Sequence, residues 1–130
     1  MYKTSTNYFK KLSWALAFLI LAYTGSRIFH SVQRQTYLAT LENALASLAV
    51  EQEIYFSTHF TYTSELVDLH INDAGPLIFS LVVNSQGWSG IVRHEKLSSE
   101  DGCVTYFGTG KIFPLGTTAP QFPGDIACTP

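Results

Sequence analysis

The pattern of apolar and polar positions predicts one long helix over the first half of the chain. Its early part is apolar on all sides, and after Ser31 the apolar residues fall at helical spacing on a single stripe. Neither proline nor glycine interrupts the chain from Arg27 to Phe56. We therefore expect one helix from about Tyr8 to Phe56, whose first half leaves the folded domain and whose second half packs on it.

The second half of this helix carries the residues expected to contact a sheet. The apolar positions of the stripe are separated by steps of three and four, which places them on one helical face. Polar side chains, among them Gln33, Asn43 and Gln52, are expected on the other faces. The predicted helix–sheet packing residues are Leu38, Leu41, Leu45, Leu48 and Tyr55.

Signals for β-structure follow the helix. A short helical segment is expected first, with Thr63 or Ser64 as its cap and Glu65 in its first turn. The chain as a whole is expected to have an α+β fold, with a long N-terminal helix packed on a small antiparallel sheet. Branched residues and turn signals predict extended segments at Leu77–Val83, Trp88–His94, Cys103–Phe107, Lys111–Phe113 and Ile126–Cys128.

The uncharged run Leu12–Ser26 is a candidate membrane anchor. A straight span needs about 20 residues, so this run is short. Its length becomes adequate if Lys11 and Arg27 extend toward the headgroups while the two residues after Arg27 still contact lipid. The expected anchor residues are Leu12, Trp14, Leu16, Phe18, Leu19, Ile20 and Leu21.

The same run could also be a cleaved secretory signal or a buried helix. A secretory signal has a basic start, an apolar stretch and small residues such as Thr24, Gly25 and Ser26. The helical pattern that continues beyond the run favours a retained anchor over a signal. The lysines beside the run argue against a buried helix of a soluble domain.

Charge is distributed unevenly and gives the anchor a direction. Residues 1–41 carry five Lys or Arg and no acid, whereas residues 42–130 carry three Lys or Arg and ten acids, so +5 and −7 make the net charge of −2. The positive-inside tendency places the N-terminus in the cytoplasm and the acidic part outside it. The expected partner is therefore the lipid bilayer and not a nucleic acid. The predicted parts are a cytoplasmic stub (1–11), a transmembrane half-helix (12–29), an amphipathic half-helix (30–58) and a β-sheet head (59–130).

Cys103 and Cys128 are the only cysteines in the chain. An even pair in an extracytoplasmic segment favours a disulfide. It would close a loop whose constraint contributes about 3 kcal/mol in the chain-entropy model. A metal site and a reactive thiol are the competing hypotheses, and both lack supporting CxxC or Cys–His spacing.

The sequence contains no motif of an enzyme or of a bound cofactor. GxSxG, phosphate-binding loops and HExxH are absent, so neither catalysis nor a cofactor is expected. The one metal hypothesis is a calcium site on the C-terminal loops, because calcium prefers several oxygen ligands. A solvated acidic loop is the favoured interpretation, since the acids lack the alternation of an EF-hand loop. The calcium candidates are Glu95, Glu100, Asp101 and Asp125.

Several segments resemble type IV pilins and type II secretion pseudopilins. The stretch Ala-Ser-Leu-Ala-Val-Glu-Gln-Glu-Ile-Tyr-Phe at 46–56 resembles the end of the long pilin helix. Tyr62-Thr63-Ser64 and Leu66-Val67-Asp68-Leu69 resemble the turn after it. The hairpin segment Gly87-Trp88-Ser89-Gly90 and the cysteine pair fit the pilin head and its disulfide-bounded C-terminal loop.

The resemblance implies a pilin-like fold and a non-enzymatic structural role. Such a protein is a subunit anchored in a bacterial inner membrane, and its N-terminal helix packs with other pilin-like subunits in a type IV pilus, a surface filament or a secretion pseudopilus. The chain departs from the family at its front, where no glycine precedes the apolar run and no acid precedes Glu42. It would therefore be a minor or atypical component. The alternative is a stand-alone, single-pass anchored binding module.

Overall fold

The computed structural model of this protein describes residues 5–72, 75–109 and 118–130, with side chains from residue 11 onward. The chain forms two compact units that divide between Gln35 and Thr36. The first unit is the early part of the helix. The second contains the helix from Thr36 onward together with the sheet, so most of the amphipathic half-helix lies in the same compact unit as the β-sheet head.

Helix α1 runs from Ser5 to His59, three residues longer at each end than the predicted Tyr8–Phe56. Its C-terminal end is closed without glycine. Phe60 adopts a left-handed backbone conformation with φ of 57°, and its N–H donates to the carbonyl of Phe56 at 2.8 Å. This bond satisfies a carbonyl of the last turn, which is how a left-handed residue ends a helix.

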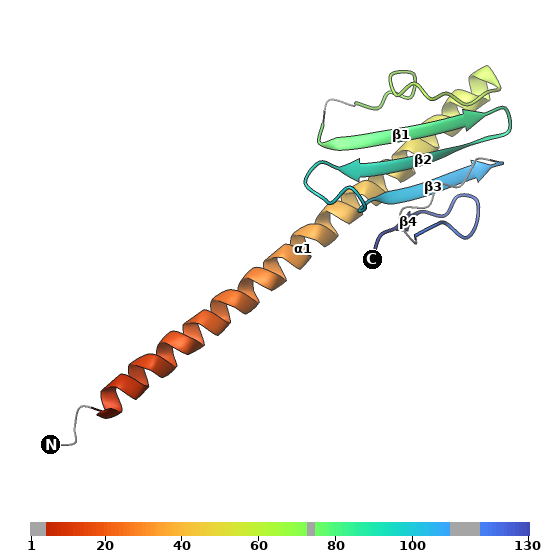
Figure 1. The fold of residues 1–130 in the computed structure, drawn as a ribbon. Helices are drawn as coiled ribbons and strands as arrows, with labels where there is room; N and C mark the ends of the chain where they lie inside the picture. Colours follow the sequence, from red (N-terminus) through yellow and green to blue (C-terminus); the bar gives the residue numbers. More distant parts are fainter. Residues whose placement is uncertain (1–4, 73–74, 110–117) are drawn as a thin grey trace. The chain divides into compact units, whose positions relative to one another are not determined.

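Within the described residues the sheet has four antiparallel strands in the order β1-β2-β3-β4, so each strand lies beside its neighbour in the chain (Figure 1). The predicted α+β class is confirmed. The strand expected at Lys111–Phe113 lies outside the described residues. The strands are β1 (Leu77–Asn84), β2 (Gly87–His94), β3 (Cys103–Gly108) and β4 (Ala127–Cys128).

Within the second unit, α1 runs along one face of the sheet (Figure 1). The helix contributes Leu41, Leu45 and Leu48 to the core, and the central strand contributes Trp88 and Val92; all five are fully buried. Burying side chains of this size is worth about 1.5–3 kcal/mol each. The helical stripe and the alternating residues of the sheet therefore form one continuous core.

Gly90 lets the helix and the sheet approach each other. A Cβ at this position would lie 3.2 Å from Cδ2 of Leu48, 3.1 Å from Cδ2 of Leu81 and 3.2 Å from Cζ3 of Trp88. These distances are shorter than ordinary van der Waals contacts in a packed core, so a larger residue at position 90 would displace its neighbours. Leu48 of the helix packs against the space that a side chain at residue 90 would need.

The short helix predicted after Thr63 is wrong, because the chain makes only a single turn there. Its expected cap is present, since Thr63 Oγ1 accepts the N–H of Glu65 at 3.1 Å. The turn then ends at His70, whose φ is 53°. The N–H of Ile71 donates to the Leu66 carbonyl at 3.0 Å, which closes the turn in the manner of a Schellman motif.

Candidate functional site

The apolar run of α1 forms an exposed surface within the first unit. The predicted anchor residues are between 54% and 70% exposed, with Leu16 at the low end and Phe18 and Leu21 at the high end. The exposed apolar residues continue through Ile28, Phe29 and Val32. By length and composition the described part of α1 is suited to cross a membrane, and none of its most apolar segment is buried. Water is a poor solvent for such a surface, whereas lipid covers it without cost.

Polar side chains inside this run have partners on their own helix. The hydroxyl of Thr24 donates to the Ile20 carbonyl at 2.9 Å, and the hydroxyl of Ser26 donates to the Tyr23 carbonyl at 2.9 Å. Because a donor without an acceptor is costly in hydrocarbon, these bonds make the segment compatible with a bilayer.

Tyr23 and Arg27 mark the end of the apolar run. The guanidinium of Arg27 donates to the Tyr23 hydroxyl at 2.9 Å, and its Cζ lies 5.3 Å from the centre of the tyrosine ring. Tyrosine and arginine with an apolar body and a polar tip are typical of membrane–water boundaries. The pair is therefore suited to the headgroup region.

In the second unit the structure brings the predicted helix–sheet residues together. Leu41, Leu45 and Leu48 are fully buried, whereas Leu38 and Tyr55, at the two ends of the stripe, are half-buried against the same core.

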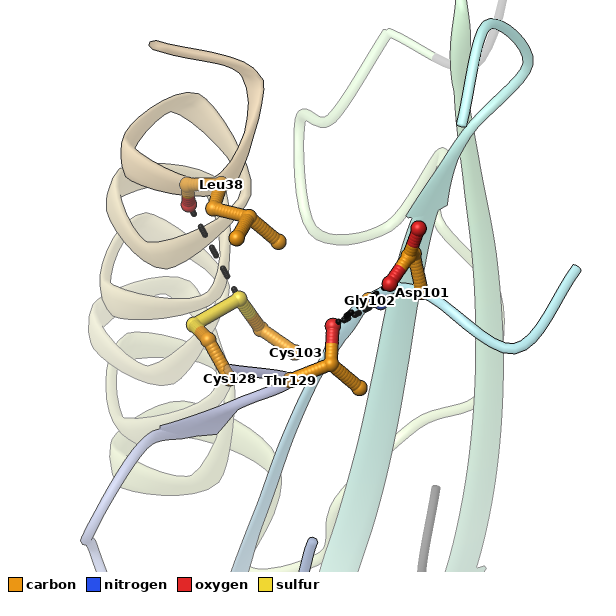
Figure 2. Close-up of a disulfide and its surroundings, with 6 residues drawn as sticks. All are labelled: Leu38, Asp101, Gly102, Cys103, Cys128 and Thr129. Atoms are coloured by element: carbon orange, nitrogen blue, oxygen red, sulfur yellow. Dashed lines mark hydrogen bonds between the residues drawn. A yellow bond between two sulfur atoms is a disulfide. The ribbon is translucent and has the colours of Figure 1, made fainter. Parts of the chain in front are cut away.

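Cys103 and Cys128 form a disulfide, shown in Figure 2. They lie directly opposite each other in the pairing of β3 with β4. Sγ of Cys103 is 3.8 Å from the carbonyl oxygen of Leu38. A disulfide sulfur carries no hydrogen, so this is a packing contact, and it places the disulfide against α1.

Hydrogen bonds fix the C-terminal residues beside the disulfide (Figure 2). Thr129 donates its N–H to the Gly102 carbonyl at 3.0 Å, and its hydroxyl accepts the N–H of Gly102 at 3.2 Å. The same hydroxyl donates to Oδ1 of Asp101 at 3.2 Å. The disulfide and Thr129 thus hold the end of the chain against β3.

The acids considered for calcium are not brought together. Among the described residues no group of three or more His, Cys, Asp or Glu side chains is placed to hold a metal ion. Two of the four acids have structural partners instead: Asp101 accepts from Thr129, and Oδ2 of Asp125 accepts the N–H of Phe122 at 3.1 Å. Glu95 and Glu100 lie exposed on the loop between β2 and β3.

The histidines have separate surroundings. His94 is buried, lies 4.3 Å from the Tyr37 ring and accepts the N–H of Lys96 through Nδ1 at 3.1 Å. The ring of His59 stacks on Tyr55 at 4.0 Å. His70 and Glu51 both line a shallow pocket of about 360 Å³. Nδ1 of His70 lies 3.5 Å from Oε2 of Glu51. His30 is exposed on the first unit.

Gln52 is the residue whose place the sequence pattern does not reveal. The pattern predicts it on a polar face, but it is fully buried on the leucine stripe. Its Nε2 donates to the Thr63 carbonyl at 2.6 Å, and its Oε1 accepts the Thr63 N–H at 3.2 Å. The step of four from Leu48 to Gln52 is the available signal, because it continues the spacing of the stripe.

Comparison with known proteins gives no relative: no protein-family model, no curated protein and no solved structure matches the chain.

Proposed function

We propose that this protein is a pilin-like structural subunit anchored in a bacterial inner membrane. The anchor is the first half of α1, and the second half joins the sheet in a head outside the cytoplasm. The protein would act as a minor or atypical component of a type IV pilus or a type II secretion pseudopilus.

The observation that carries the proposal is the change of character along a single helix. Residues Leu12 to Phe29 of α1 expose apolar side chains on all sides, and the same helix later buries Leu41, Leu45 and Leu48 against the sheet. In a soluble domain, burial of apolar surface is the main source of folding free energy. The apolar surface of the first half of α1 is exposed, so it does not stabilise a soluble fold and instead marks an interaction surface. One helix that serves both a bilayer and a sheet is the arrangement expected of a pilin-like subunit.

Charge and residue size support the orientation and the partners proposed. The lysines before the anchor favour an N-terminus in the cytoplasm. All ten acids lie from Glu42 onward, in the part proposed to lie outside. Small residues would let neighbouring helices approach closely in a bundle of subunits. These residues are Ala15, Ala22, Gly25 and Ser26.

A second candidate function is a stand-alone anchored binding module. It is favoured by the absence of any acid before Glu42, because a pilin uses an acid near its mature N-terminus to pair with a neighbouring subunit's amine. A carboxylate in lipid is retained only where it is paired, so a lone anchor has no use for one.

Membrane insertion and orientation are tested in bacterial spheroplasts, in which added protease reaches the outer face of the inner membrane. The full chain should stay in the membrane pellet after alkaline carbonate washing, and protease added outside the inner membrane should remove the head. Recovery in the soluble fraction, or a head protected from the protease, would rule out the proposed anchor or its orientation.

Assembly is tested on protein extracted in mild detergent. A subunit of a filament should co-purify with other pilin-like proteins, and processing would give an N-terminus near Leu12. An intact start at Met1 together with a monomeric mass would instead support the lone binding module.

A further inference from the structure

Arg93 is a half-buried charged side chain without a partner. It lies on β2 opposite Ile78 of β1, on the face of the sheet away from α1, since the neighbouring Val92 belongs to the core. Its Nε is buried and unpaired, and no described residue forms a hydrogen bond or an ion pair with its guanidinium. The other two buried side-chain atoms without a partner among the described residues belong to the neutral residues Trp88 and Ser89. An unpaired buried donor is most costly on a charged group, so Arg93 is expected to have a partner from outside the chain.

Arg93 also lines a cavity at the end of β2, where the loop to β3 begins. The cavity has a volume of about 300 Å³, at the small end of the range for ligand pockets. Ile78 and Leu97 give it apolar walls, and Ser98 and Ser99 add two hydroxyl groups. The cavity therefore has room for a small ligand beside a cation and two hydroxyls.

The hydroxyls of Ser98 and Ser99 are available to donate. Oγ of Ser98 accepts the N–H of Glu100 at 3.2 Å, which leaves the hydroxyl hydrogen for another acceptor. The Ser99 hydroxyl has no hydrogen bond within the described part of the chain. The guanidinium and the two hydroxyls thus form a set of donors. Such a set is suited to an anionic group with several acceptor oxygens.

Hydrogen bonds hold the loop that carries the two serines. Nδ1 of His94 accepts the N–H of Lys96 at 3.1 Å, and the carbonyl of His94 accepts the N–H of Leu97 at 2.9 Å. The carbonyl of Ser98 accepts the N–H of Asp101 at 3.0 Å. The loop is therefore ordered before a ligand arrives, so binding requires little further ordering.

We propose that this cavity binds a phosphate group, with Arg93 as its charged donor and the hydroxyls of Ser98 and Ser99 as its neutral donors. Three donating side chains match the several oxygens of a phosphate better than the two oxygens of a carboxylate. Arginine is also the cation best suited to phosphate, because its guanidinium presents several N–H groups in a fixed plane. A phospholipid headgroup and a free phosphate ion present the same oxygens, and the test below separates these two sources.

Glu95 sets the strength of the site. Its carboxylate also lines the cavity but does not pair with Arg93. A negative charge beside a bound anion weakens binding. Glu95→Gln should therefore strengthen phosphate binding, about threefold, and this variant moves the affinity in the direction opposite to loss of Arg93.

Nuclear magnetic resonance of the full chain in maltoside micelles, which contain no phosphate, tests the site directly. The Nε–H resonance of Arg93, identified by its loss in Arg93→Gln, reports on the unpaired atom. Inorganic phosphate should shift this resonance along a saturable curve with its midpoint in the millimolar range. The absence of a saturable shift, or an equal shift with chloride at the same ionic strength, would overturn the proposal.

Substitutions separate the site from general charge attraction, with binding followed by the ³¹P line width of phosphate. Arg93→Gln should weaken binding about tenfold or more, because it removes the hydrogen bonds of a charged donor. The matched control is Lys96→Gln, which removes the same charge from an exposed position of the same loop outside the cavity and should change binding less than about twofold. Arg93→Gln should also keep the native melting temperature, since Arg93 has no partner in the described chain to lose. Equal weakening by Arg93→Gln and Lys96→Gln would refute a specific site.

Phosphatidylglycerol added to the micelles identifies the source of the phosphate. A shift of the Arg93 resonance with this lipid, without inorganic phosphate, would support the site and assign it to a headgroup. A shift with inorganic phosphate alone would support the site and assign it to the free ion. A resonance that moves with neither would overturn phosphate binding at Arg93, and the membrane anchor proposed above would be unaffected by that result.

Discussion

The side-chain amide of Gln52 pairs with the peptide groups of Thr63 as a neighbouring strand would. It donates to the Thr63 carbonyl at 2.6 Å and accepts the Thr63 N–H at 3.2 Å, in a fully buried position. The two residues are eleven positions apart, on either side of the end of α1. This pair fixes where the chain turns back from the helix toward the sheet.

Gln52→Ala should destabilise the second unit by about 2–4 kcal/mol, because both peptide groups of Thr63 would stay buried without partners. Chemical denaturation measures the loss. The matched control is Asn43→Ala, on an exposed position of the same helix, and it should change stability by less than about 0.5 kcal/mol. Similar losses in the two variants would mean that Gln52 contributes only through its helix position.

Removing the disulfide should cost about 3 kcal/mol, because the tail would regain conformational freedom in the unfolded state. The variant is the double substitution Cys103→Ala and Cys128→Ala, which avoids leaving a lone thiol. Dithiothreitol should lower the melting temperature of the native protein and leave that of the variant unchanged. Equal stability of the native and reduced protein would contradict a structural role for the disulfide.

The leucine stripe and the strands could be predicted because their signals are local and periodic. Steps of three and four fix one helical face, and branched residues between turn signals fix the strands. Gln52 continues the spacing of the stripe, but its polar side chain leads to the prediction of an exposed face. Its burial depends on the peptide groups of Thr63, which the helix pattern does not reveal. The prediction of a short helix at Glu65–His70 failed for a related reason. The turn is ended by a histidine in the left-handed conformation, whereas sequence patterns associate this conformation with glycine.

The candidate sites were predictable only where composition leaves few choices. Two cysteines allow one intramolecular disulfide, and the apolar run is recognised as a candidate anchor by its composition and the charges beside it. The acids proposed for calcium are near each other in the sequence, except for Asp125, but closeness in sequence does not make their oxygens converge. Asp101 and Asp125 instead bond Thr129 and the backbone of Phe122.

Gly90→Ala should destabilise the head by about 1–3 kcal/mol through overpacking. The added methyl would meet side chains of Leu81, Leu48 and Trp88 at 3.1–3.2 Å. Gly75→Ala is the matched control, since no atom of the described residues lies within 4 Å of its added Cβ. Thermal denaturation of both variants separates the effect of space from that of glycine itself, and an unaffected Gly90→Ala would show that the three side chains can move aside.

Tyr62 should ionise above the usual range of a tyrosine. Burial raises its pKa above 10.0, and the charge of Glu53 and its hydrogen bond with the phenol raise it further. The folded state therefore favours the neutral phenol, so this contribution to stability is fully present below about pH 10 and is lost as the pH rises through the higher, folded-state pKa. Near-ultraviolet titration should show the late transition, which Tyr62→Phe removes and Glu53→Gln moves to lower pH. A transition unchanged by Glu53→Gln would separate Tyr62 from that carboxylate.

Leu19→Arg should release the full chain from the membrane. Leu19 lies near the middle of the apolar run and is 68% exposed, and an arginine at the centre of a spanning helix costs about 2.5–3.5 kcal/mol in insertion. The retained fraction after carbonate washing should fall accordingly. Gln33→Arg, an exposed position of α1 beyond the run, adds the same charge and should leave retention unchanged. If Leu19→Arg stays in the pellet to the same extent as Gln33→Arg, the apolar run is not the segment that holds the protein in the bilayer.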